Sequence, residues 1–464
     1  MQNNMLLNQP QFSFDLIGIG IGPFNLGLAA LVHTIPNVRA CFFDQNEKFA
    51  WHPGLLIDHA QLQVPFIADL VTFASPTHPF SFLNYLHHHQ RLYKFYFREK
   101  FHVSRQEYNH YCQWVCDQLS NLTFNYRVKK VEHYQKKKNS LLYVRVENMR
   151  NHQEKCFYTK HLAIGTGTGP YVPKTLQTMN SRYIRHSAHF LEYKIEFSHE
   201  NTICVIGSGQ SAAEIILELL REYHHCPHQI IWATRSRGFF PMEYSKLGLE
   251  HFSPDYINYF YSLDQKTKYD TVHHQHLMYK GISQTTIAEI YDMLYQLTVA
   301  NKTQPLQMLS HSDCQSIKKG TTSRFTLQFN QWQTKSLFDI DCDAVICATG
   351  YQPKNIDFLN DLSHELIADD NQPFALNNDF SLCTTPSLKN KIYMQNNSLF
   401  SHGVGSPDLG LICYRNSLIL NQICKKEIYP IHTKNIFQDF TCDAKEGIVY
   451  DTHPSRSYFS EKFS

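Results

Sequence analysis

Two glycine-rich turns, each set between an apolar run and a helical pattern, constrain the fold of this 464-residue chain more than any other feature. The first turn contains Gly18, Gly20 and Gly22. Apolar residues precede it from position 14, and residues 23–31 follow with helical apolar spacing. A strand, a glycine turn and a helix in this order form the opening βα unit of a dinucleotide-binding domain. The chain is therefore predicted to start as an α/β nucleotide fold.

An acid follows the first turn at the distance that such a unit requires. Residues 38–44 form a second apolar run that ends in Asp44. The glycines leave room for a pyrophosphate against the helix N-terminus, and Asp44 can accept hydrogen bonds from ribose hydroxyls. Pro23 stands where the fingerprint has its third glycine, which the first helical position tolerates because that N–H has no helical partner. A lone glycine turn is a weak signal, but this complete context favours a cofactor site.

A second unit of the same kind begins at residue 202. Its turn and helix start comprise Gly207, Ser208, Gly209, Gln210 and Ser211. The next apolar run, residues 230–235, ends in Arg235 instead of an acid. An arginine at this place suits a ribose phosphate, which favours NADPH over NADH. Arg237 is a competing candidate, and for either arginine the alternative is an ordinary surface position.

Two dinucleotide sites in one chain imply an electron path, in which NADPH delivers hydride to a flavin and the flavin passes electrons onward. Disulfide reductases of this architecture need a CxxC pair beside the flavin, and none of the 13 cysteines forms one. Oxygen or a small organic molecule is the remaining acceptor. The scattered thiols are expected to be reduced and mostly buried.

The domain order follows from the positions of the glycine-ended strands. Besides the two turns, residues 162–167 and 343–351 are apolar strands that end in small residues and glycine, which let a backbone approach a cofactor closely. Residues 245–300 have helical periodicity and are predicted to form a small substrate-binding lobe. We expect two Rossmann-like domains in an α/β fold: FAD-binding on residues 1–195 and 335–464, and NADPH-binding, with the lobe, on residues 196–334.

Composition argues against several other classes of protein. The formal net charge is +2 without a long Lys/Arg run, so nucleic acid is a poor partner. No stretch approaches ~18 consecutive apolar residues, so no membrane span is expected. Residues 1–11 lack a secretory signal, so a cytoplasmic location is expected. No metal site is expected, because adjacent histidines splay over different helix faces. The polar tail after Asp443 is expected to be disordered.

Six further segments carry a family resemblance: residues 51–54 (WHPG), 62–70 (LQVPFIADL), 79–85 (PFSFLNY), 105–112 (RQEYNHYC), 348–351 (ATGY) and 402–410 (HGVGSPDLG). With the second glycine turn, they resemble the N-hydroxylating flavin monooxygenases of siderophore pathways, over nearly the whole chain to about Ile423. These are the lysine, ornithine and diamine N-monooxygenases. The resemblance implies FAD in the first site, NADPH in the second and O2 activation as a flavin hydroperoxide, which bound NADP⁺ shields from water. It also implies a homo-oligomer, a dimer or tetramer.

The resemblance further implies which residues contact the cofactors. FAD would contact Gly18, Gly20, Gly22, Pro23, Asp44, Lys48, Trp51, His52, Gln63, Pro407, Asp408 and Leu409. NADPH would contact Gly207, Ser208, Gly209, Gln210, Ser211 and Arg235 and, on a looser match, residues 278–280. No catalytic acid, base or nucleophile is assigned, because a neutral amine itself attacks the distal peroxide oxygen. A closed pocket favours that neutral amine, since desolvation lowers an amine pKa from about 10.4.

Departures from the family pattern bear on the substrate. Members that act on lysine or ornithine carry a lysine where Ala68 stands, and that lysine anchors the substrate α-carboxylate. Two further anchors in those members, an Asn or Asp and a Ser, are Leu249 and Gly410 here. Each lost charged hydrogen bond is worth roughly 1.5–3 kcal/mol, so an α-amino acid should lose several powers of ten in affinity. An amine without an α-carboxylate is therefore the expected substrate.

The segment around Ala68 is similar to the diamine branch, which takes putrescine or cadaverine. The second ammonium of a buried diamine needs a carboxylate, for which Asp408, Glu250 and Glu243 are candidates, although each is equally well a surface or cofactor-shell acid. The expected substrate contacts are Ala68, Leu249, Glu250, His251, Asp408 and Gly410. We therefore predict N-hydroxylation of a diamine, with O2, for hydroxamate siderophore biosynthesis. Histamine, lysine or ornithine as substrate, an uncoupled NADPH oxidase, and a nucleotide-binding scaffold without redox chemistry remain alternatives.

Overall fold

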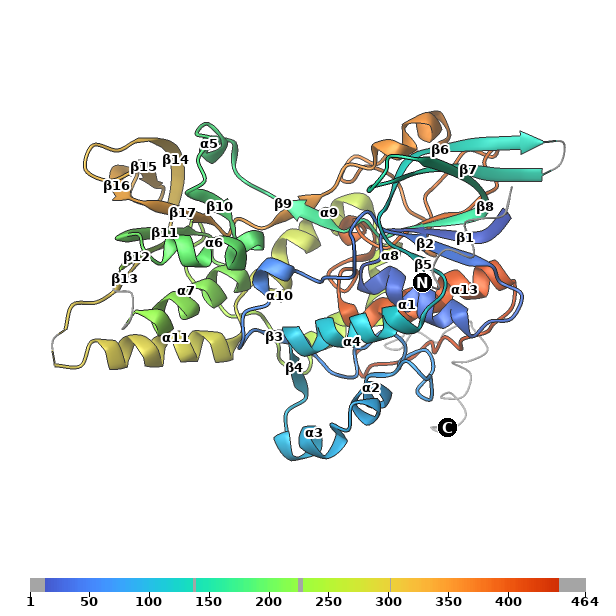
Figure 1. Ribbon diagram of the computed structural model, residues 1–464, viewed down its shortest axis with the longest axis horizontal. Helices are drawn as coiled ribbons and strands as arrows, with labels where there is room; N and C mark the ends of the chain where they lie inside the picture. Colours follow the sequence, from blue (N-terminus) through green and yellow to red (C-terminus); the bar gives the residue numbers. More distant parts are fainter. Residues whose placement is uncertain (1–12, 137–138, 224–227, 301, 442–464) are drawn as a thin grey trace.

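The structure is a computed structural model, which describes residues 13–136, 139–223, 228–300 and 302–441. Residues 1–11 and the tail after Asp443, on which two expectations above depend, lie outside the described residues. Figure 1 shows two sheet-containing halves side by side. The short ribbon of β9 (Thr168–Pro170) and β18 (Tyr351–Pro353) lies between them.

The first sheet has seven strands in the order β5-β2-β1-β8-β7-β6, with β19 also paired to β8. The strands are β1 (Ser13–Ile19), β2 (Ala40–Phe43), β5 (Leu122–Thr123), β6 (Tyr126–Lys136), β7 (Asn139–Asn148), β8 (Glu154–Ile164) and β19 (Ile392–Met394). β1 pairs in parallel with β2 and β8, and β5 and β19 extend the parallel part. Carboxyl ends of parallel strands meet at one edge, which is where such folds bind ligands.

Three helices cover one face of this sheet: α1 (Pro23–His33), α4 (Arg105–Gln118) and α13 (Ile412–Cys424) (Figure 1). Their apolar residues form one buried core with β1 and β2, which includes Leu16, Leu28 and Ile419. Ser104 caps the N-terminus of α4, because its side chain accepts a hydrogen bond from the N–H of Glu107. Pro23 is the first residue of α1, as predicted.

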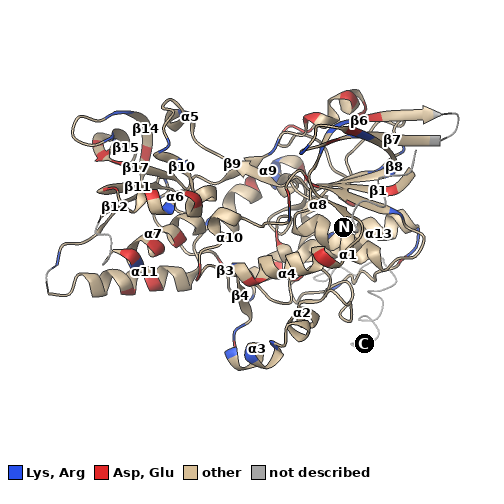
Figure 2. Ribbon diagram, in the orientation of Figure 1, with Lys and Arg blue, Asp and Glu red and all other residues tan. Residues whose placement is uncertain are grey.

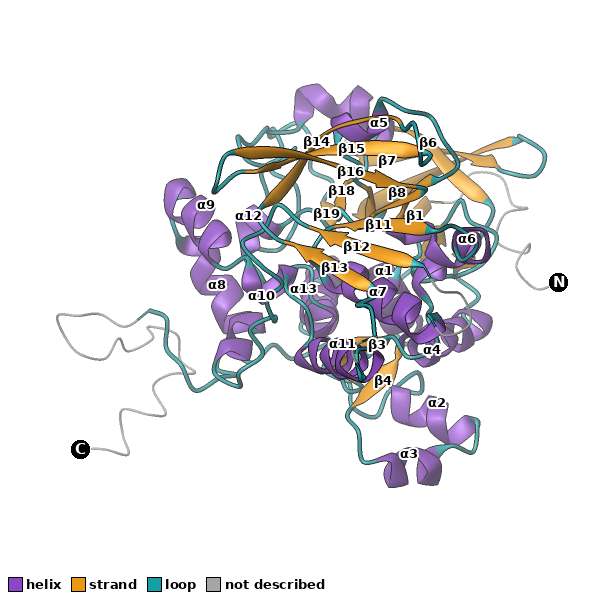
Figure 3. Cartoon of the chain, turned by 90° about the vertical axis from the view of Figure 1, so that its left-hand side faces the viewer, coloured by secondary structure: helices purple, strands orange, loops and turns teal. Residues whose placement is uncertain are grey.

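The second sheet has five parallel strands in the order β10-β17-β11-β12-β13. They are β10 (Ile184–His186), β11 (Thr202–Ile206), β12 (Gln229–Ala233), β13 (Leu306–Leu309) and β17 (Ala344–Cys347). Helices α7 (Gln210–Glu222) and α11 (Gln284–Leu297) lie below it in Figure 3, and an antiparallel sheet of β14 (Ser312–Lys319), β15 (Phe325–Gln331) and β16 (Ser336–Cys342) lies above. The predicted α/β fold with two nucleotide-binding units is confirmed.

Strand pairing shifts the expected domain boundaries. β10 and β17 lie outside the predicted inserted segment, residues 196–334, yet both pair within the second sheet. The reason is physical: β17 pairs with β11 across about 140 intervening residues, and apolar composition alone does not reveal a partner so distant in the chain. That FAD binds to the half with the first glycine turn and NADPH to the half with the second stays a prediction.

Residues 245–300 are largely helical, as predicted, with α8 (Pro254–Ser262), α9 (Gln265–His274), α10 (Leu277–Lys280) and α11. They do not form one separate lobe. α8 and α9 pack on α12 (Leu399–His402), around a core that includes Tyr256 and Phe260, whereas α11 packs on α7. The segment therefore spans both halves of the molecule.

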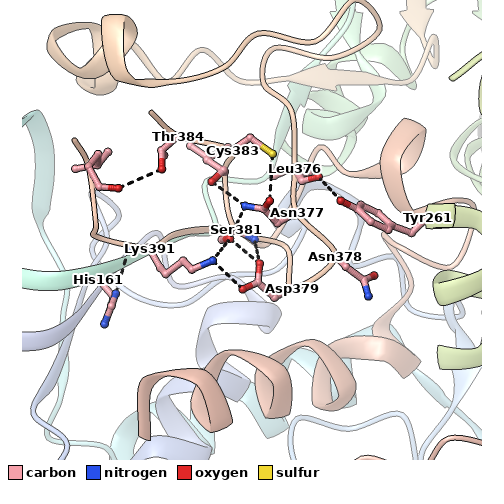
Figure 4. A network of polar contacts seen from close by, with 12 residues as sticks. His161, Tyr261, Leu376, Asn377, Asn378, Asp379, Ser381, Cys383, Thr384 and Lys391 are labelled. Carbon is pink, nitrogen blue, oxygen red and sulfur yellow. Dashed lines mark hydrogen bonds and ion pairs between the residues drawn. The ribbon is translucent and has the colours of Figure 1, made fainter. Parts of the chain in front are cut away.

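A polar network fixes the long connection from the 3₁₀ helix η5 (Asp357–Glu365) to β19, and Figure 4 shows it. The Lys391 ammonium lies 3.2 Å from the Asp379 carboxylate and donates a hydrogen bond of 3.1 Å to Ser381. The Lys391 N–H donates to His161 of β8, and Tyr261 of α8 donates to the Leu376 carbonyl. The loop is thereby attached to the first sheet and to α8.

A hairpin of two short helices, α2 (Phe82–His88) and α3 (Leu92–Arg98), projects beside the ribbon of β3 (Gln61–Pro65) and β4 (His102–Ser104) (Figure 1). Figure 2 shows basic residues on α3 and acidic residues on α7 and α11. The remaining helices are α5 (Lys174–Gln177) and α6 (Phe190–Phe197). Within the described ranges, no helix is long and apolar enough to cross a membrane, and no group of three or more His, Cys, Asp or Glu is placed to hold a metal ion.

Candidate active site

The first glycine turn joins β1 to α1 and leaves open space at the helix N-terminus. Gly20 has φ 86°, and a Cβ there would lie 2.4 Å from the carbonyl oxygen of Gly165, at the end of β8. At Gly22, the N-cap of α1, a Cβ would meet only that oxygen, at 3.9 Å. No acidic side chain lies in the first turn of α1. The geometry therefore suits an anionic group held by the helix N-terminus.

Asp44 lies at the carboxyl end of β2 and holds the first glycine turn. Its Oδ2 accepts a hydrogen bond of 2.7 Å from the N–H of Ile21, and its Oδ1 accepts one of 2.8 Å from the N–H of Asn46. Each carboxylate oxygen has a second lone pair, which can accept from a ribose hydroxyl. The predicted role of Asp44 is compatible with this arrangement.

The second glycine turn repeats the design between β11 and α7. Gly207 has φ 136°, and a Cβ there would lie 2.1 Å from the Ala348 carbonyl oxygen at the end of β17. Gly209 is the N-cap of α7 and has no neighbour closer than 3.9 Å to its Cβ position. The Gln210 side chain accepts from the N–H of Ser283 at 2.8 Å and donates to Glu214 at 3.1 Å. Gln210 thus holds the start of α11 against this turn.

A cavity of about 2350 Å³ receives side chains from both halves of the molecule. The predicted site residues on its wall are Gln63, Ala68, Gly207, Ser208, Gly209, Gln210, Ser211, Arg235, Leu249, Pro407, Asp408 and Gly410. The other predicted site residues are described but are not on this wall: Gly18, Gly20, Gly22, Pro23, Asp44, Lys48, Trp51, His52, Glu250, His251 and Leu409. The structure therefore brings the predicted NADPH residues and four of the predicted substrate residues to one cavity, with the first glycine turn outside it.

One end of the cavity is cationic. Arg235, Arg237 and Lys280 lie on the wall beside the second glycine turn. Desolvation by the surrounding protein and the nearby charge of Arg235 lower the pKa of Lys280, so the two cations lie close enough to repel each other. Trp332 donates a hydrogen bond of 2.9 Å to the Arg235 carbonyl and so fixes that segment. A ribose phosphate is the kind of group that such a cluster binds.

At another part of the wall, Ala68, Gly410 and Asp408 are neighbours. A Cβ on Gly410 would lie 4.0 Å from the Ala68 Cβ and 2.9 Å from Asp408 Oδ1. Asp408 Oδ1 accepts a hydrogen bond of 2.7 Å from the N–H of Gly410, and burial raises the pKa of this carboxyl to about 6. Burial and the Asp408 charge raise the pKa of Tyr244, on the same wall, to about 12. A carboxylate thus stands beside Ala68 and Gly410, two of the positions predicted to contact the substrate.

Glu250 and His251, predicted to contact the substrate, do not line the cavity, and both contact the C-terminal segment instead. The Glu250 carboxylate accepts hydrogen bonds of 3.0 Å from the N–H groups of Phe437 and Gln438. The His251 ring packs against Tyr256 and Phe440, at 4.7 and 5.1 Å between ring centroids. Glu243, the third acid considered, accepts a hydrogen bond from the N–H of Ser245 within its own loop. Asp408 is thus the one of these three acids that lies on the wall.

The segment after β2 reaches the cavity through aromatic contacts. The N–H of Trp51 donates to Asn109 at 2.8 Å, and the His52 ring lies 6.0 Å from the ring of Tyr351, which is on the cavity wall. Desolvation by the surrounding protein and the charge of Arg105 lower the pKa of His52 below its usual value, although the residue is exposed to solvent. The Lys48 side chain is exposed.

An ion pair between the two halves has no counterpart among the predicted site residues. The guanidinium of Arg105, at the start of α4, makes two hydrogen bonds of 2.8 and 3.0 Å to the Glu214 carboxylate of α7. Both side chains are nearly buried, and Arg105 also donates to the Leu55 carbonyl at 2.7 Å. Because Glu214 also bonds to Gln210, the pair connects α4 to the second glycine turn. The only sequence signal was that Arg105 lies in a family-like segment.

Comparison with known proteins gives relatives over most of the chain. The rhizobactin siderophore biosynthesis protein RhbE of Rhizobium meliloti (strain 1021) is 40% identical over 433 residues, which cover 92% of this chain and 95% of that protein. A putrescine N-hydroxylase of Shewanella oneidensis is 40% identical over 445 residues, 95% of this chain and 88% of the relative. Neither alignment leaves a large part of either chain unmatched.

Solved structures and family models agree with these relatives. The crystal structure of DfoA bound to FAD, the desferrioxamine-pathway cadaverine monooxygenase of Erwinia amylovora, matches with a TM-score of 0.89 and 35% identity, over 93% of this chain and 99% of that one. Residues 12–353 match the family model described as L-lysine 6-monooxygenase/L-ornithine 5-monooxygenase. The family resemblance drawn from the motifs is confirmed: this chain belongs to the L-lysine 6-monooxygenase/L-ornithine 5-monooxygenase family.

Proposed function

We propose that this protein uses FAD, NADPH and O2 to hydroxylate one primary amine of an aliphatic diamine, putrescine or cadaverine, in hydroxamate siderophore biosynthesis. The observation that carries the proposal is the position of Asp408 beside Ala68 and Gly410 on the cavity wall. Relatives named as a putrescine N-hydroxylase and a cadaverine monooxygenase support it.

The residues present fit both dinucleotides. At Gly22 and Gly209, the two helix N-caps, a Cβ would have no neighbour closer than 3.9 Å, so a phosphate can approach the backbone N–H groups. Asp44 offers lone pairs to the ribose at the first turn, and Arg235 offers a fork of N–H donors to a 2′-phosphate at the second. FAD, when bound, would supply the activation of O2 with electrons from NADPH.

Asp408 would bind the ammonium that is not hydroxylated. Its pKa of about 6 leaves the carboxyl ionised at pH 7 to 8, so it can accept hydrogen bonds from an ammonium group. Ala68 and Gly410 add no cation and no bulk next to that carboxylate. An α-amino acid would bring its own carboxylate to this wall, where Asp408 repels it and no lysine anchors it.

The reacting amine has to be neutral to act as a nucleophile. Enclosure in the cavity favours the neutral form, because removing water from an ammonium costs free energy. Water exclusion by the wall also protects reactive intermediates from hydrolysis. No side chain of the chain is assigned as an acid or base, since positioning and desolvation account for the step.

The test is amine profiling of the purified enzyme. We expect N-hydroxylated product with putrescine or cadaverine, with NADPH consumption matched to product. Lysine, ornithine and histamine are the comparison substrates, and greater product from lysine or ornithine would contradict the proposal. Hydrogen peroxide without any hydroxylamine, for every amine, would identify an uncoupled oxidase instead.

Asp408→Asn is the variant that tests the substrate contact. The amide keeps the shape and can still accept the Gly410 N–H, but it lacks the charge. Loss of a charged hydrogen bond of about 1.5–3 kcal/mol predicts a rise in diamine KM of roughly 10- to 150-fold. Butylamine, which has no second ammonium, is the control substrate, and its KM should change little. Equal rises for both amines would show that Asp408 acts on the cofactor or the fold.

We also propose that the enzyme works in the cytoplasm as a homo-oligomer, a dimer or tetramer. Four aromatic side chains on and beside α3 support self-association: Tyr93, Tyr96, Phe97 and Phe101 are 79%, 71%, 74% and 71% exposed. Free cysteines without a disulfide among the described residues agree with a reducing compartment. Light scattering after gel filtration measures the mass, and cell fractionation locates the protein; a monomer or an extracellular protein would contradict the respective part.

A further inference from the structure

Arg415, in the first turn of α13, is a cation buried without an anion. Its side chain is 0% exposed, and none of the salt bridges between described residues includes it. Burial lowers the pKa of the guanidinium to about 9, which leaves it charged at neutral pH. A buried charge without a counter-charge is costly, and proteins rarely retain one without a use.

The guanidinium joins two segments at the ligand-binding edge of the first sheet. It donates to the carbonyl of Gln395, and Nη2 donates to the Ser406 carbonyl at 2.5 Å and to the Ser406 hydroxyl at 3.2 Å. Gln395 itself donates from its N–H to the carbonyl of Ile164, the last residue of β8. Ser406 directly precedes the loop of residues 407–410 on the cavity wall. The Nε of Arg415 has no hydrogen-bond partner.

Two aromatic rings enclose the guanidinium. Its carbon lies 4.8 Å from the ring centroid of Phe24 and 4.1 Å from that of Phe380. Phe24 is the second residue of α1, directly after the Gly22–Pro23 turn, and α1 and α13 are neighbours on the same face of the sheet (Figure 1). The positive charge therefore lies directly behind the first glycine turn.

Phe380 is held in an unfavourable conformation to make this contact. Its φ is 62°, in the left-handed region that bulky residues avoid, and its side chain is 0% exposed. The network of Figure 4, with Asp379 and Ser381 on either side of Phe380 and Lys391 bonded to both, fixes the backbone. Backbone strain and a buried charge without a counter-anion thus occur at one place, next to the first glycine turn.

We propose that Arg415 is a positioning residue for FAD, whose charge favours the anionic cofactor between the first glycine turn and the 407–410 loop. This inference rests on the proposed function. The oxidised cofactor brings the negative charge of its pyrophosphate, and reduction adds negative charge to the ring. A buried cation that lacks a counter-anion in the protein alone then gains a nearby negative charge when FAD binds.

Three substitutions separate charge from packing. Arg415→Lys keeps the charge and loses the planar fork, Arg415→Gln keeps a donor and loses the charge, and Arg415→Met keeps bulk alone. Arg324→Gln is the matched control, because Arg324 also stacks on a ring, Tyr183 at 3.6 Å, and pairs with Glu200, but belongs to the second half. For each protein, FAD is removed, and the unfolding temperature, the FAD Kd and the reduction potential of the rebound flavin are measured.

We expect Arg415→Gln and Arg415→Met to raise the FAD Kd about tenfold or more, because a buried cation without a counter-anion attracts the pyrophosphate across an interior of low dielectric constant. Arg415→Lys and Arg324→Gln should stay within about threefold of wild type. The reduction potential of the flavin should be lower in the neutral variants than in Arg415→Lys. Removing the positive charge destabilises the reduced flavin, which is more negative, more than it destabilises the oxidised flavin. A structural role alone would instead lower the unfolding temperature of the FAD-free protein in all three Arg415 variants, with the flavin potential unchanged.

Two results would overturn the inference. One is a neutral variant that folds and binds FAD as tightly as Arg415→Lys does. The other applies if neither neutral variant folds, so that only Arg415→Lys can be measured. Its FAD Kd should then lie within about threefold of the wild-type value. A tenfold higher Kd would show that the planar fork of the arginine matters and the charge does not. Wild-type protein that binds no FAD at all would contradict the proposed function itself, which is a distinct outcome.

Discussion

The two ends of the cavity differ in the charge of their side chains. At the second glycine turn, Arg235, Arg237 and Lys280 surround the space, whereas at the wall of Ala68 and Gly410 the charged group is the Asp408 carboxylate. One cavity can therefore bind an anionic dinucleotide at one end and a cationic amine at the other, because each end repels the other ligand. The glycine turns thus identify a nucleotide-binding fold, whereas a few charged side chains on the cavity wall determine which ligand binds at each end.

The strongest way to break this difference is to place a cation at the substrate end. In Ala68→Lys, an ammonium would compete with the diamine for Asp408 and repel it. Two like charges about 4 Å apart, at an effective dielectric constant near 20, repel by about 4 kcal/mol, so we expect diamine KM to rise at least roughly 100-fold. Product formation with putrescine and cadaverine measures it. Ala68→Met, of similar length without charge, is the control, and equal losses in both variants would attribute the effect to bulk.

The corresponding change at the cationic end is Arg235→Ser. Loss of a charge-assisted contact with a 2′-phosphate should raise the NADPH KM roughly 10- to 100-fold and leave the NADH KM nearly unchanged. Anaerobic flavin reduction by each nucleotide measures the two effects. Arg237→Ser, tested in parallel, decides which arginine binds the phosphate. Equal effects on NADPH and NADH would mean that Arg235 has no part in phosphate recognition.

The sequence could predict the features that are local in the chain and could not predict those that depend on long-range contacts. Both glycine turns, Asp44 and the strand before Arg235 were predictable, because strand, turn and helix are adjacent in the chain and each has its own pattern. The turning of Glu250 toward Gln438 was not, since 188 residues separate the two. Likewise, Arg105 and Glu214 are 109 residues apart, and β17 joins β11 only through the fold. Contacts of this kind depend on packing that no local pattern records.

Protonation of Asp408 is a reversible way to remove the charge at the substrate end. Its pKa in the folded protein is about 6, above the ordinary value of 3.8, so the carboxylate is present above pH 6 and is lost as pH falls below it. Diamine kcat/KM should therefore fall by about an extra tenfold per pH unit below pH 6, in addition to the fall that every amine shows as it protonates. Butylamine should lack this additional inflection, and so should Asp408→Asn with a diamine. An identical profile for both amines would contradict a contact between Asp408 and the second ammonium.

The smallest change that sharpens the comparison is Gly410→Ser, because it tests the one anchor that can be restored without adding charge. A Cβ there would lie 2.9 Å from Asp408 Oδ1, which is the movable end of a side chain, and 4.0 Å from Ala68 Cβ, so the wall can accept it with a small shift. The new hydroxyl would donate to one lone pair of the Asp408 carboxylate and leave its charge and its other lone pairs to the ammonium, so we expect a rise in diamine KM of only about 2- to 10-fold. Gly410→Ala adds the same Cβ without the hydroxyl. If Gly410→Ala raises the diamine KM as much as Gly410→Ser does, displacement of the Asp408 carboxylate by the added bulk explains the effect. If only Gly410→Ser raises the KM, the hydroxyl occupies lone pairs through which the carboxylate binds the ammonium.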